Sequence, residues 1–150
     1  EALRPAFKEY SGRIIENAAV LAEALKEGGV RLVSDGTDNH LILADCNSKG
    51  ISGLKAQNAL QGAGIVANKN TIPYDTRSPF IGSGLRLGSP ALTSRGMGPD
   101  EMRRVAAWMV RVLDDPDGLG VREQVRGEVA DFARAYPVPG ITDARPLTKV

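Results

Sequence analysis

The sequence holds a single cysteine, Cys46, and has almost no excess of charge of either sign. Without a second cysteine an intramolecular disulfide is impossible, which is typical of a reducing compartment, so we expect a cytoplasmic protein. We expect Cys46 to be a small buried apolar residue and not a nucleophile. The net charge of +1 argues against a nucleic-acid partner and against binding to a charged membrane surface.

The sequence also lacks an apolar run long enough to cross a bilayer, and it lacks a leader of basic and apolar residues. We therefore expect no membrane partner. It begins on an amphipathic helix pattern without a start methionine, which favours a fragment of a longer protein. Its 150 residues, 42% hydrophobic and 25% charged, are typical of one globular domain with its own core.

Apolar residues recur at helical and at strand spacing, and turn residues separate the segments. The pattern predicts helices over residues 5–27, 52–62, 99–113 and 121–136, and strands over 30–33, 40–45, 65–67 and 84–88. Few, short strands with mixed connections indicate an α+β fold, with helices packed on one face of a short mixed or antiparallel sheet. Residues 1–137 are interpreted as one domain that opens with a long helix, and residues 138–150 as a loosely held tail. Trp108 lies off the centre of the buried stripe of its helix, so we expect it to face another domain.

The stretch from Asn68 to Gly96 has no sustained helical periodicity, and it carries Pro73, Pro79 and Pro90 among several glycines. Proline fixes φ and glycine permits positive φ, so this backbone is expected to hold a defined shape. Its apolar residues argue against disorder. Long irregular segments within compact domains usually carry function, so the sequence predicts a binding loop.

Within this stretch, Gly84-Leu-Arg-Leu-Gly88 reads as a short strand in which Leu85 and Leu87 point to one face and Arg86 to the other. An arginine between two apolar neighbours is held by their packing, and its planar fork suits a carboxylate or a phosphate. Spacing alone leaves a surface arginine on an edge strand equally possible. Arg77 and Arg95 lie in polar turns of the same stretch, so we expect both to be solvated.

His40 is the only histidine of the chain. It could serve as an acid or base, or as a hydrogen-bonding wall residue. We favour a structural role, in which Asp38, Asn39 and His40 hold a turn through side-chain hydrogen bonds to nearby backbone.

Several motifs in register closely resemble the C-terminal part of serine hydroxymethyltransferase. They are Asn68-Lys-Asn-Thr-Ile-Pro73, Arg77-Ser-Pro-Phe80, Ser83-Gly-Leu-Arg-Leu-Gly-Ser-Pro-Ala-Leu-Thr-Ser-Arg-Gly96, Thr37-Asp-Asn-His-Leu41 and Ala107-Trp-Met109. The resemblance runs from about Phe7 to about Pro137 without large gaps, which makes it far more specific than a lone glycine motif.

The resemblance implies the small C-terminal domain of a fold-type-I pyridoxal-phosphate enzyme, and a homodimer for the full-length enzyme. Such enzymes interconvert L-serine plus tetrahydrofolate and glycine plus 5,10-methylenetetrahydrofolate. By the same resemblance, Arg86 binds the substrate carboxylate, and Asn70, Ser78, Pro79 and Phe80 contact the folate. Asn70 can donate and accept hydrogen bonds together, as a pteridine edge requires, and Phe80 offers an apolar wall.

The Thr-rich motif that ends in His-Lys and carries the Schiff-base lysine of the family does not occur here. We therefore expect no catalytic residue in this chain, no activity of the chain alone, and a large cofactor-binding domain as its partner. We expect no metal site. The alternative is a non-catalytic binding or assembly domain with the same fold. A nucleic-acid module that uses the arginines and Lys69 of the loop is disfavoured by the near-neutral charge.

Overall fold

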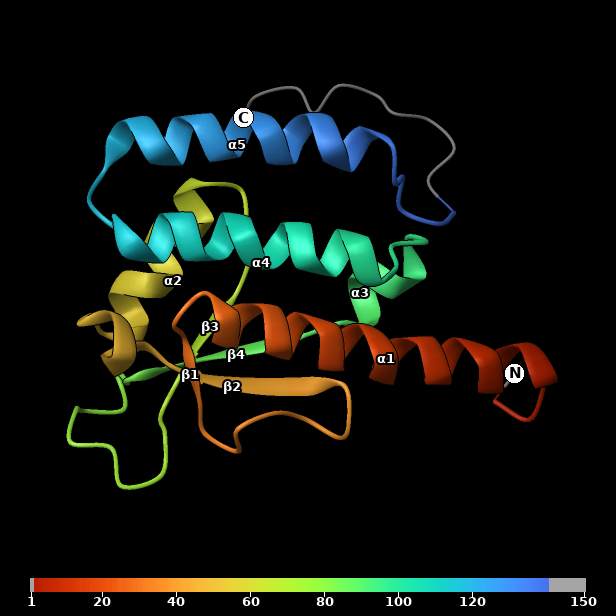
Figure 1. The fold of residues 1–150 in the computed structure, drawn as a ribbon, viewed down its shortest axis with the longest axis horizontal. Coiled ribbons are helices and arrows are strands. Elements are labelled where there is room, and N and C mark those ends of the chain that lie inside the picture. Colours follow the sequence, from red (N-terminus) through yellow and green to blue (C-terminus); the bar gives the residue numbers. More distant parts are fainter. Residues whose placement is uncertain (1, 141–150) are drawn as a thin grey trace.

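The computed structural model describes residues 2–140 and consists of a four-stranded antiparallel sheet with helices packed against one face (Figure 1). The strand order is β1-β2-β4-β3, so β3 and β1 are the edges. The elements in chain order are α1 (Pro5–Glu27), β1 (Arg31–Leu32), β2 (Leu41–Asp45), η1 (Cys46–Lys49), α2 (Gly53–Gly62), β3 (Asn68–Asn70), β4 (Gly84–Gly88), α3 (Pro90–Ser94), α4 (Pro99–Asp114) and α5 (Leu119–Arg134). The expected α+β class, with helices on one sheet face, is confirmed.

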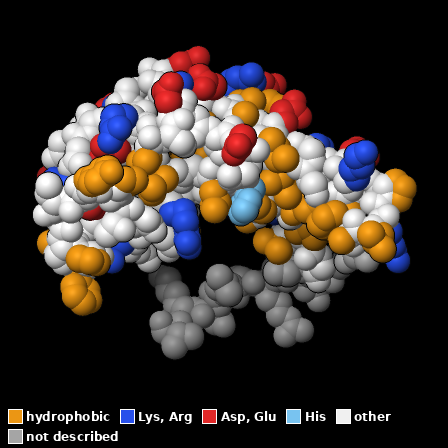
Figure 2. Space-filling model, turned by 90° about the horizontal axis from the view of Figure 1, so that it is seen from below, with side chains coloured by type: hydrophobic (Ala, Val, Ile, Leu, Met, Phe, Trp, Pro, Cys, Tyr) orange, Lys and Arg blue, Asp and Glu red, His pale blue; other side chains and the backbone are white. Residues whose placement is uncertain are grey.

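The register of the central strands divides the sheet into two chemically different faces. Ile42 lies opposite Leu87 and Ala44 opposite Leu85, and all four side chains are buried beneath the helices. Directly paired residues of an antiparallel ladder share a face, so the residues between these pairs point to the other side. We call that other side the open face. Figure 2 views the molecule from this side, where hydrophobic side chains are exposed among charged ones.

The helices form above the sheet because each places an apolar stripe on the core. On α1, Leu21 and Leu25 are buried, but Phe7 is 40% exposed, since the first turns of this helix extend past the sheet (Figure 1). The buried Asn17 compensates for its burial by donating hydrogen bonds of 2.9 Å to Thr93 Oγ1 and to the carbonyl oxygen of Met97. This pair of bonds joins α1 to α3 and to the start of α4.

The strand expected over residues 65–67 lies at Asn68–Asn70, although α2 ends at Gly62 as expected, because the residues that follow the helix are used to close its C-terminus. Gly64 has a φ of +80°, and the backbone N–H of Ile65 still bonds to the carbonyl oxygen of Leu60 at 2.9 Å, which closes the helix. Pairing with β4 therefore starts only at Asn68.

Trp108 does not face outward, as its position in the helix suggested. It is 3% exposed and packs edge-on against Phe132 of α5, with ring centroids 5.1 Å apart. Its indole N–H donates to Glu128 at 2.6 Å, so α5 covers the side of α4 that the sequence left for another domain.

None of the helices described is both long and apolar enough to cross a membrane. The expected domain boundary at residue 137 stays a prediction, because most of the expected tail, residues 141–150, lies outside the described part of the chain.

Candidate functional site

Arg86 stands at the centre of the open face. In the ladders it lies opposite Leu43 of β2 on one side and Asn68 of β3 on the other, while its neighbours Leu85 and Leu87 are buried on the helix side. The alternation predicted from sequence is thus confirmed. Arg86 is exposed, and within residues 2–140 its guanidinium has no hydrogen bond or ion pair. Because the backbone of Arg86 is held in the sheet and its guanidinium is exposed, the guanidinium is available to bind an anionic ligand.

Asn70 shares this face at the end of β3, opposite Gly84. Its side-chain amide donates a 2.7 Å hydrogen bond to the carbonyl oxygen of Thr71, which fixes the orientation of the group. Position 84 requires glycine, because a Cβ there would lie 2.8 Å from Ile72 and 3.0 Å from the carbonyl oxygen of Ala44. Without a side chain at position 84, strands β3 and β4 can approach each other closely where Asn70 pairs with Gly84.

The loop of residues 71–83 joins β3 to β4 and extends beyond the sheet on the side of the open face (Figure 1). Its distal turn carries three residues expected from sequence to contact folate. Ser78 Oγ accepts the backbone N–H of Phe80 at 3.2 Å, the carbonyl oxygen of Pro79 accepts Lys69 Nζ at 3.4 Å, and the ring of Phe80 is 84% exposed. The turn therefore presents one polar and two apolar side chains to solvent at the rim of the face that carries Arg86.

The carboxylate of Asp75 organises this loop, and sequence reasoning missed it. It accepts backbone N–H groups from Ile72, Arg77 and Ser83, at 3.2, 2.9 and 2.8 Å, and the hydroxyl of Ser83 at 2.6 Å. The Ser83 hydroxyl and these N–H groups lower the pKa of Asp75 to about 2, because they stabilise the ionised carboxylate. The local signal was the spacing of Asp75 and Arg77, since aspartate often accepts the N–H two residues later.

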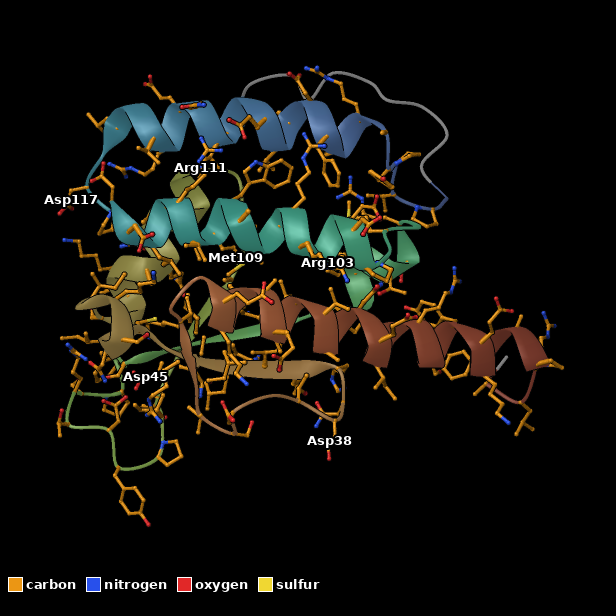
Figure 3. All side chains as sticks on the ribbon, in the orientation of Figure 1. Asp38, Asp45, Arg103, Met109, Arg111 and Asp117 are labelled. Atoms are coloured by element: carbon orange, nitrogen blue, oxygen red, sulfur yellow. The ribbon has the colours of Figure 1, made fainter. Side chains whose placement is uncertain are left out.

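A polar chain continues from Asp75 to the end of β2. Arg77 donates to Ser83 Oγ at 2.7 Å and also to the side-chain oxygen of Asn47. The backbone N–H of Asn47 donates in turn to Asp45, whose carboxylate forms a 2.8 Å ion pair with Arg31. Asp45 is labelled in Figure 3, near the base of the loop. Arg77 was expected from sequence to be solvated, but it bridges the loop to the sheet. The contact depends on residues 30 positions apart, which the sequence pattern does not reveal.

None of the described lysines other than Lys69 donates a side-chain hydrogen bond to the loop of residues 71–83, and Lys8 is exposed on the first turns of α1. Three of them form ion pairs: Lys26 with Asp35 at 3.0 Å, Lys49 with Asp114 at 2.5 Å, and Lys55 with Asp117 at 2.6 Å. Lys69 pairs with Leu85 in the ladder, and its Nζ donates to the carbonyl oxygen of Pro79 in the loop at 3.4 Å. Within residues 2–140, no three His, Cys, Asp or Glu side chains are grouped as a metal ion would require.

Cys46 and His40 differ in outcome. Cys46 is buried, as expected, and burial raises the pKa of its thiol to about 12, which leaves it protonated and unreactive. The turn before β2 is held mainly by Thr37 and Asn39: Thr37 Oγ1 donates to the carbonyl oxygen of Leu41 at 2.6 Å, and Asn39 Oδ1 accepts its N–H at 2.7 Å. The exposed His40 has no side-chain hydrogen bond within the described residues, so its expected part in holding the turn is not seen.

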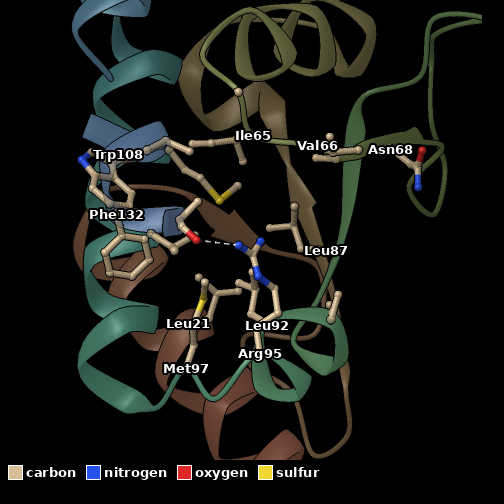
Figure 4. Close-up of a pocket in the computed structure, with 18 of the residues that line it drawn as sticks. Leu21, Ile65, Val66, Asn68, Leu87, Leu92, Arg95, Met97, Trp108 and Phe132 are labelled. Atoms are coloured by element: carbon tan, nitrogen blue, oxygen red, sulfur yellow. Dashed lines mark hydrogen bonds between the residues drawn. The ribbon is translucent and has the colours of Figure 1, made fainter. Parts of the chain in front are cut away.

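A concavity of about 440 Å³ lies between α3, α4, α5 and the β3 edge of the sheet (Figure 4). Its walls are mostly apolar, with Leu92, Met97 and Phe132 among them, and Arg95 reaches into it. Arg95 donates to the carbonyl oxygens of Ala133 and Tyr136 at the end of α5, so this arginine stabilises a helix terminus and is not free for a ligand. Arg86 and Asn68 also line this concavity, so it borders the open face, and of its two arginines Arg86 is the one without a hydrogen bond within residues 2–140.

Comparison with known proteins places these features in a family. A model of the serine hydroxymethyltransferase family matches residues 1–109. The chain is 50% identical over 147 residues to a serine hydroxymethyltransferase of Acidothermus cellulolyticus, covering 94% of this chain and 34% of the relative. It is 49% identical over 143 residues to the serine hydroxymethyltransferase of Methanospirillum hungatei, covering 95% and 34%. The chain thus spans about a third of the length of these curated relatives, and the resemblance seen in its motifs is confirmed.

Proposed function

Since the chain belongs to the serine hydroxymethyltransferase family, we propose that it supplies the amino-acid carboxylate site and the folate loop of a longer enzyme of that activity. The complete protein would interconvert L-serine plus tetrahydrofolate and glycine plus 5,10-methylenetetrahydrofolate. The observation that carries this proposal is the exposed guanidinium of Arg86, free of partners within residues 2–140, on the same face as Asn70.

Arg86 is suited to bind the α-carboxylate of the amino acid. Two parallel N–H groups of its guanidinium can donate to both carboxylate oxygens, which fixes the position of the substrate and also its rotation. The strand holds the base of the side chain between Leu43 and Asn68, so little conformational freedom is lost on binding. The role of this chain is therefore to orient the bond that reacts.

The loop is suited to bind a reduced folate. The amide of Asn70 can donate and accept at the edge of a pteridine ring, and the exposed ring of Phe80 can cover an apolar part of the same ligand. Ser78 and Pro79 complete the turn beside Phe80. Because Asn70 lies two ladder positions from Arg86, the two ligands would meet at one end of the open face.

Pyridoxal phosphate would supply the electron sink for this chemistry. The described residues do not fit it as a binding site, because Lys26, Lys49 and Lys55 are in ion pairs, Lys69 Nζ donates to the carbonyl oxygen of Pro79, and Lys8 is exposed on the first turns of α1. We assign the cofactor to the remainder of the longer protein, which would be the partner of this chain. A cytoplasmic homodimer is the assembly that this proposal implies.

Replacing Asn70 in the full-length protein tests the folate site. Asn70→Ala should weaken tetrahydrofolate binding by about 1–3 kcal/mol, because a polar partner on the ligand would be left unsatisfied. Glycine affinity without folate should barely change. Thr76→Ala, an exposed position in the same loop with no side-chain hydrogen bond within the described residues, is the matched control. Equal losses for folate and glycine in Asn70→Ala would contradict the assignment.

A further inference from the structure

Asp75 closes the loop at its neck. One carboxylate oxygen, Oδ2, accepts the backbone N–H of Ile72 at 3.2 Å and that of Ser83 at 2.8 Å. Ile72 lies just after β3 and Ser83 just before β4, so a single atom joins the two ends of the loop. Hydrogen bonds to a charged acceptor are stronger than those between neutral groups, which makes this junction firm.

The second oxygen of Asp75 controls the distal half of the loop. Oδ1 accepts the N–H of Arg77 at 2.9 Å and the hydroxyl of Ser83 at 2.6 Å, and the Arg77 guanidinium donates to that same hydroxyl oxygen at 2.7 Å. The carbonyl oxygen of Ser78, the next residue, accepts the N–H groups of Ile81 and Gly82 at 2.9 Å each. The turn that presents Phe80 is therefore attached to the junction made by Asp75.

The neck also sets the backbone of Asn70. Gly82 has a φ of +61°, and a Cβ at this position would lie 2.5 Å from the carbonyl oxygen of Asn70. The carbonyl oxygens of Gly82 and Ile81 accept the N–H groups of Gly53 and Leu54 at 2.9 and 3.0 Å, so the neck is seated on the start of α2. Releasing Asp75 would loosen the returning half of the loop, against which Asn70 is packed.

Arg86 is positioned independently of this junction. It lies three residues beyond Ser83, within the ladder that pairs β4 with β2 and β3, and ladder hydrogen bonds on both sides hold its backbone. Loss of the Asp75 contacts should therefore disturb the surface formed by Asn70 and the Ser78–Phe80 turn, and leave the arginine in place.

We propose that Asp75 is a positioning residue that holds the loop of residues 71–83 in the conformation that binds reduced folate, without taking part in amino-acid binding. The inference rests on the proposed function of the loop. It adds a residue that touches neither ligand but determines the affinity for one of them, because the free loop would otherwise have to be ordered at the moment of binding.

The test uses Asp75→Asn, Ser83→Ala and the control Thr76→Ala in the full-length protein. Asp75→Asn replaces a double acceptor by a group with one acceptor, so the dissociation constant for tetrahydrofolate should rise by about 10- to 100-fold. Ser83→Ala keeps the backbone bonds to Asp75 and should show a smaller rise. Glycine affinity and kcat at saturating folate should stay within a few-fold of wild type. Thr76→Ala should leave every value unchanged.

Hydrogen exchange monitored by mass spectrometry provides a readout independent of folate. Peptides within residues 71–83 should exchange faster in Asp75→Asn, while peptides of α4 should not, and tetrahydrofolate should restore protection only at high concentration. Unchanged folate affinity in Asp75→Asn overturns the inference. If Asn70→Ala weakens folate in the same experiment, only the inference has failed, whereas unchanged folate affinity in both variants removes the proposed folate site as well. Equal losses of glycine and folate affinity in Asp75→Asn would also overturn it, since the effect would then be general unfolding.

Discussion

Arg95, which immediately follows α3, donates a 2.6 Å hydrogen bond from Nε to the carbonyl oxygen of Tyr136, 41 residues later in the chain. Its Nη2 bonds to the carbonyl oxygen of Ala133 at 3.0 Å. Both acceptors lie at the C-terminal end of α5, where the last carbonyl groups of a helix have no partner within the helix. A positive charge at this end also interacts favourably with the helix dipole. The arginine that reaches into the apolar concavity between α3, α4, α5 and the β3 edge of the sheet therefore has a structural role.

We expect Arg95→Ala to lower the free energy of unfolding by about 1–3 kcal/mol, because two partly buried carbonyl groups lose a charged donor. Urea denaturation followed by circular dichroism measures the change. Arg103→Ala is the matched control, since Arg103 pairs only with the exposed Asp100 on the same helix and should change stability by less than about 0.5 kcal/mol. Equal effects of the two substitutions would show that Arg95 has no capping role.

Tyr74 occupies a backbone conformation that its side chain does not favour. Its φ is +57°, and the side chain is fully exposed, so no packing compensates. Asparagine and glycine accept positive φ far more readily than tyrosine does. We expect Tyr74→Asn to raise the free energy of unfolding by about 0.5–1 kcal/mol, whereas Tyr74→Ala, which keeps a Cβ at the same φ, should bring no gain. A gain in thermal stability for alanine as large as for asparagine would contradict this explanation.

The lowered pKa of Asp75 predicts how stability depends on pH. The carboxylate has a pKa of about 2 in the folded chain against an ordinary value of 3.8, so the folded state favours the ionised form. Its contribution to stability is complete above the ordinary value and is lost as the pH falls from there through about 2. The difference in stability between wild type and Asp75→Asn should therefore narrow as the pH is lowered through this range. A difference that stays constant would mean that Asp75 is not ionised in the fold.

Helices α1, α2, α4 and α5 and the central strands could be predicted from sequence because their apolar periodicity is local information. The short helix α3 was missed, because its five residues lie in the stretch expected to be an irregular loop. Strand β4 follows directly from Leu85 and Leu87, and Ser52, where the predicted helix begins, is the N-cap of α2 and accepts the N–H of Lys55 at 3.2 Å. Strand β3 was predicted three residues too early, because Asn68–Asn70 is polar and has no apolar alternation. This edge strand is defined by its ladder pairing with β4, which the sequence pattern does not show. The apolar residues Ile65 to Ala67 instead line the concavity between α3, α4, α5 and the β3 edge of the sheet.

The candidate site was predicted only in part for a related reason. The exposure of Arg86 follows from strand alternation, and the roles of Asn70 and Phe80 come from the family resemblance and remain predictions. The junction at Asp75 depends on Ser83 and on Asn47, which lie 8 residues later and 28 residues earlier in the sequence, so only the fold reveals it. Arg77 and Arg95 were expected to be solvated, and this failed because Asn47 and Tyr136, to which they donate, lie 30 and 41 positions away in the sequence.

The proposed role of Arg86 predicts different outcomes for two substitutions in the full-length protein. Arg86→Lys should keep the fold and weaken glycine binding, because an ammonium group cannot form two parallel hydrogen bonds in one plane. Arg86→Ala should weaken glycine more strongly, by about 2–5 kcal/mol, since the carboxylate would enter the site without a partner. Arg31→Ala is a control on the same face, because this arginine is already paired with Asp45 and should leave glycine affinity unchanged.

The most direct measurement is the titration of glycine into wild type, Arg86→Lys and Arg86→Ala by isothermal calorimetry, with thermal denaturation to show that all three are folded. We expect the affinity for glycine to fall from wild type to Arg86→Lys to Arg86→Ala, while the affinity for tetrahydrofolate measured without the amino acid changes little. If folded Arg86→Ala binds glycine within a few-fold of wild type, Arg86 does not bind the carboxylate and the open face of the sheet is not the amino-acid site.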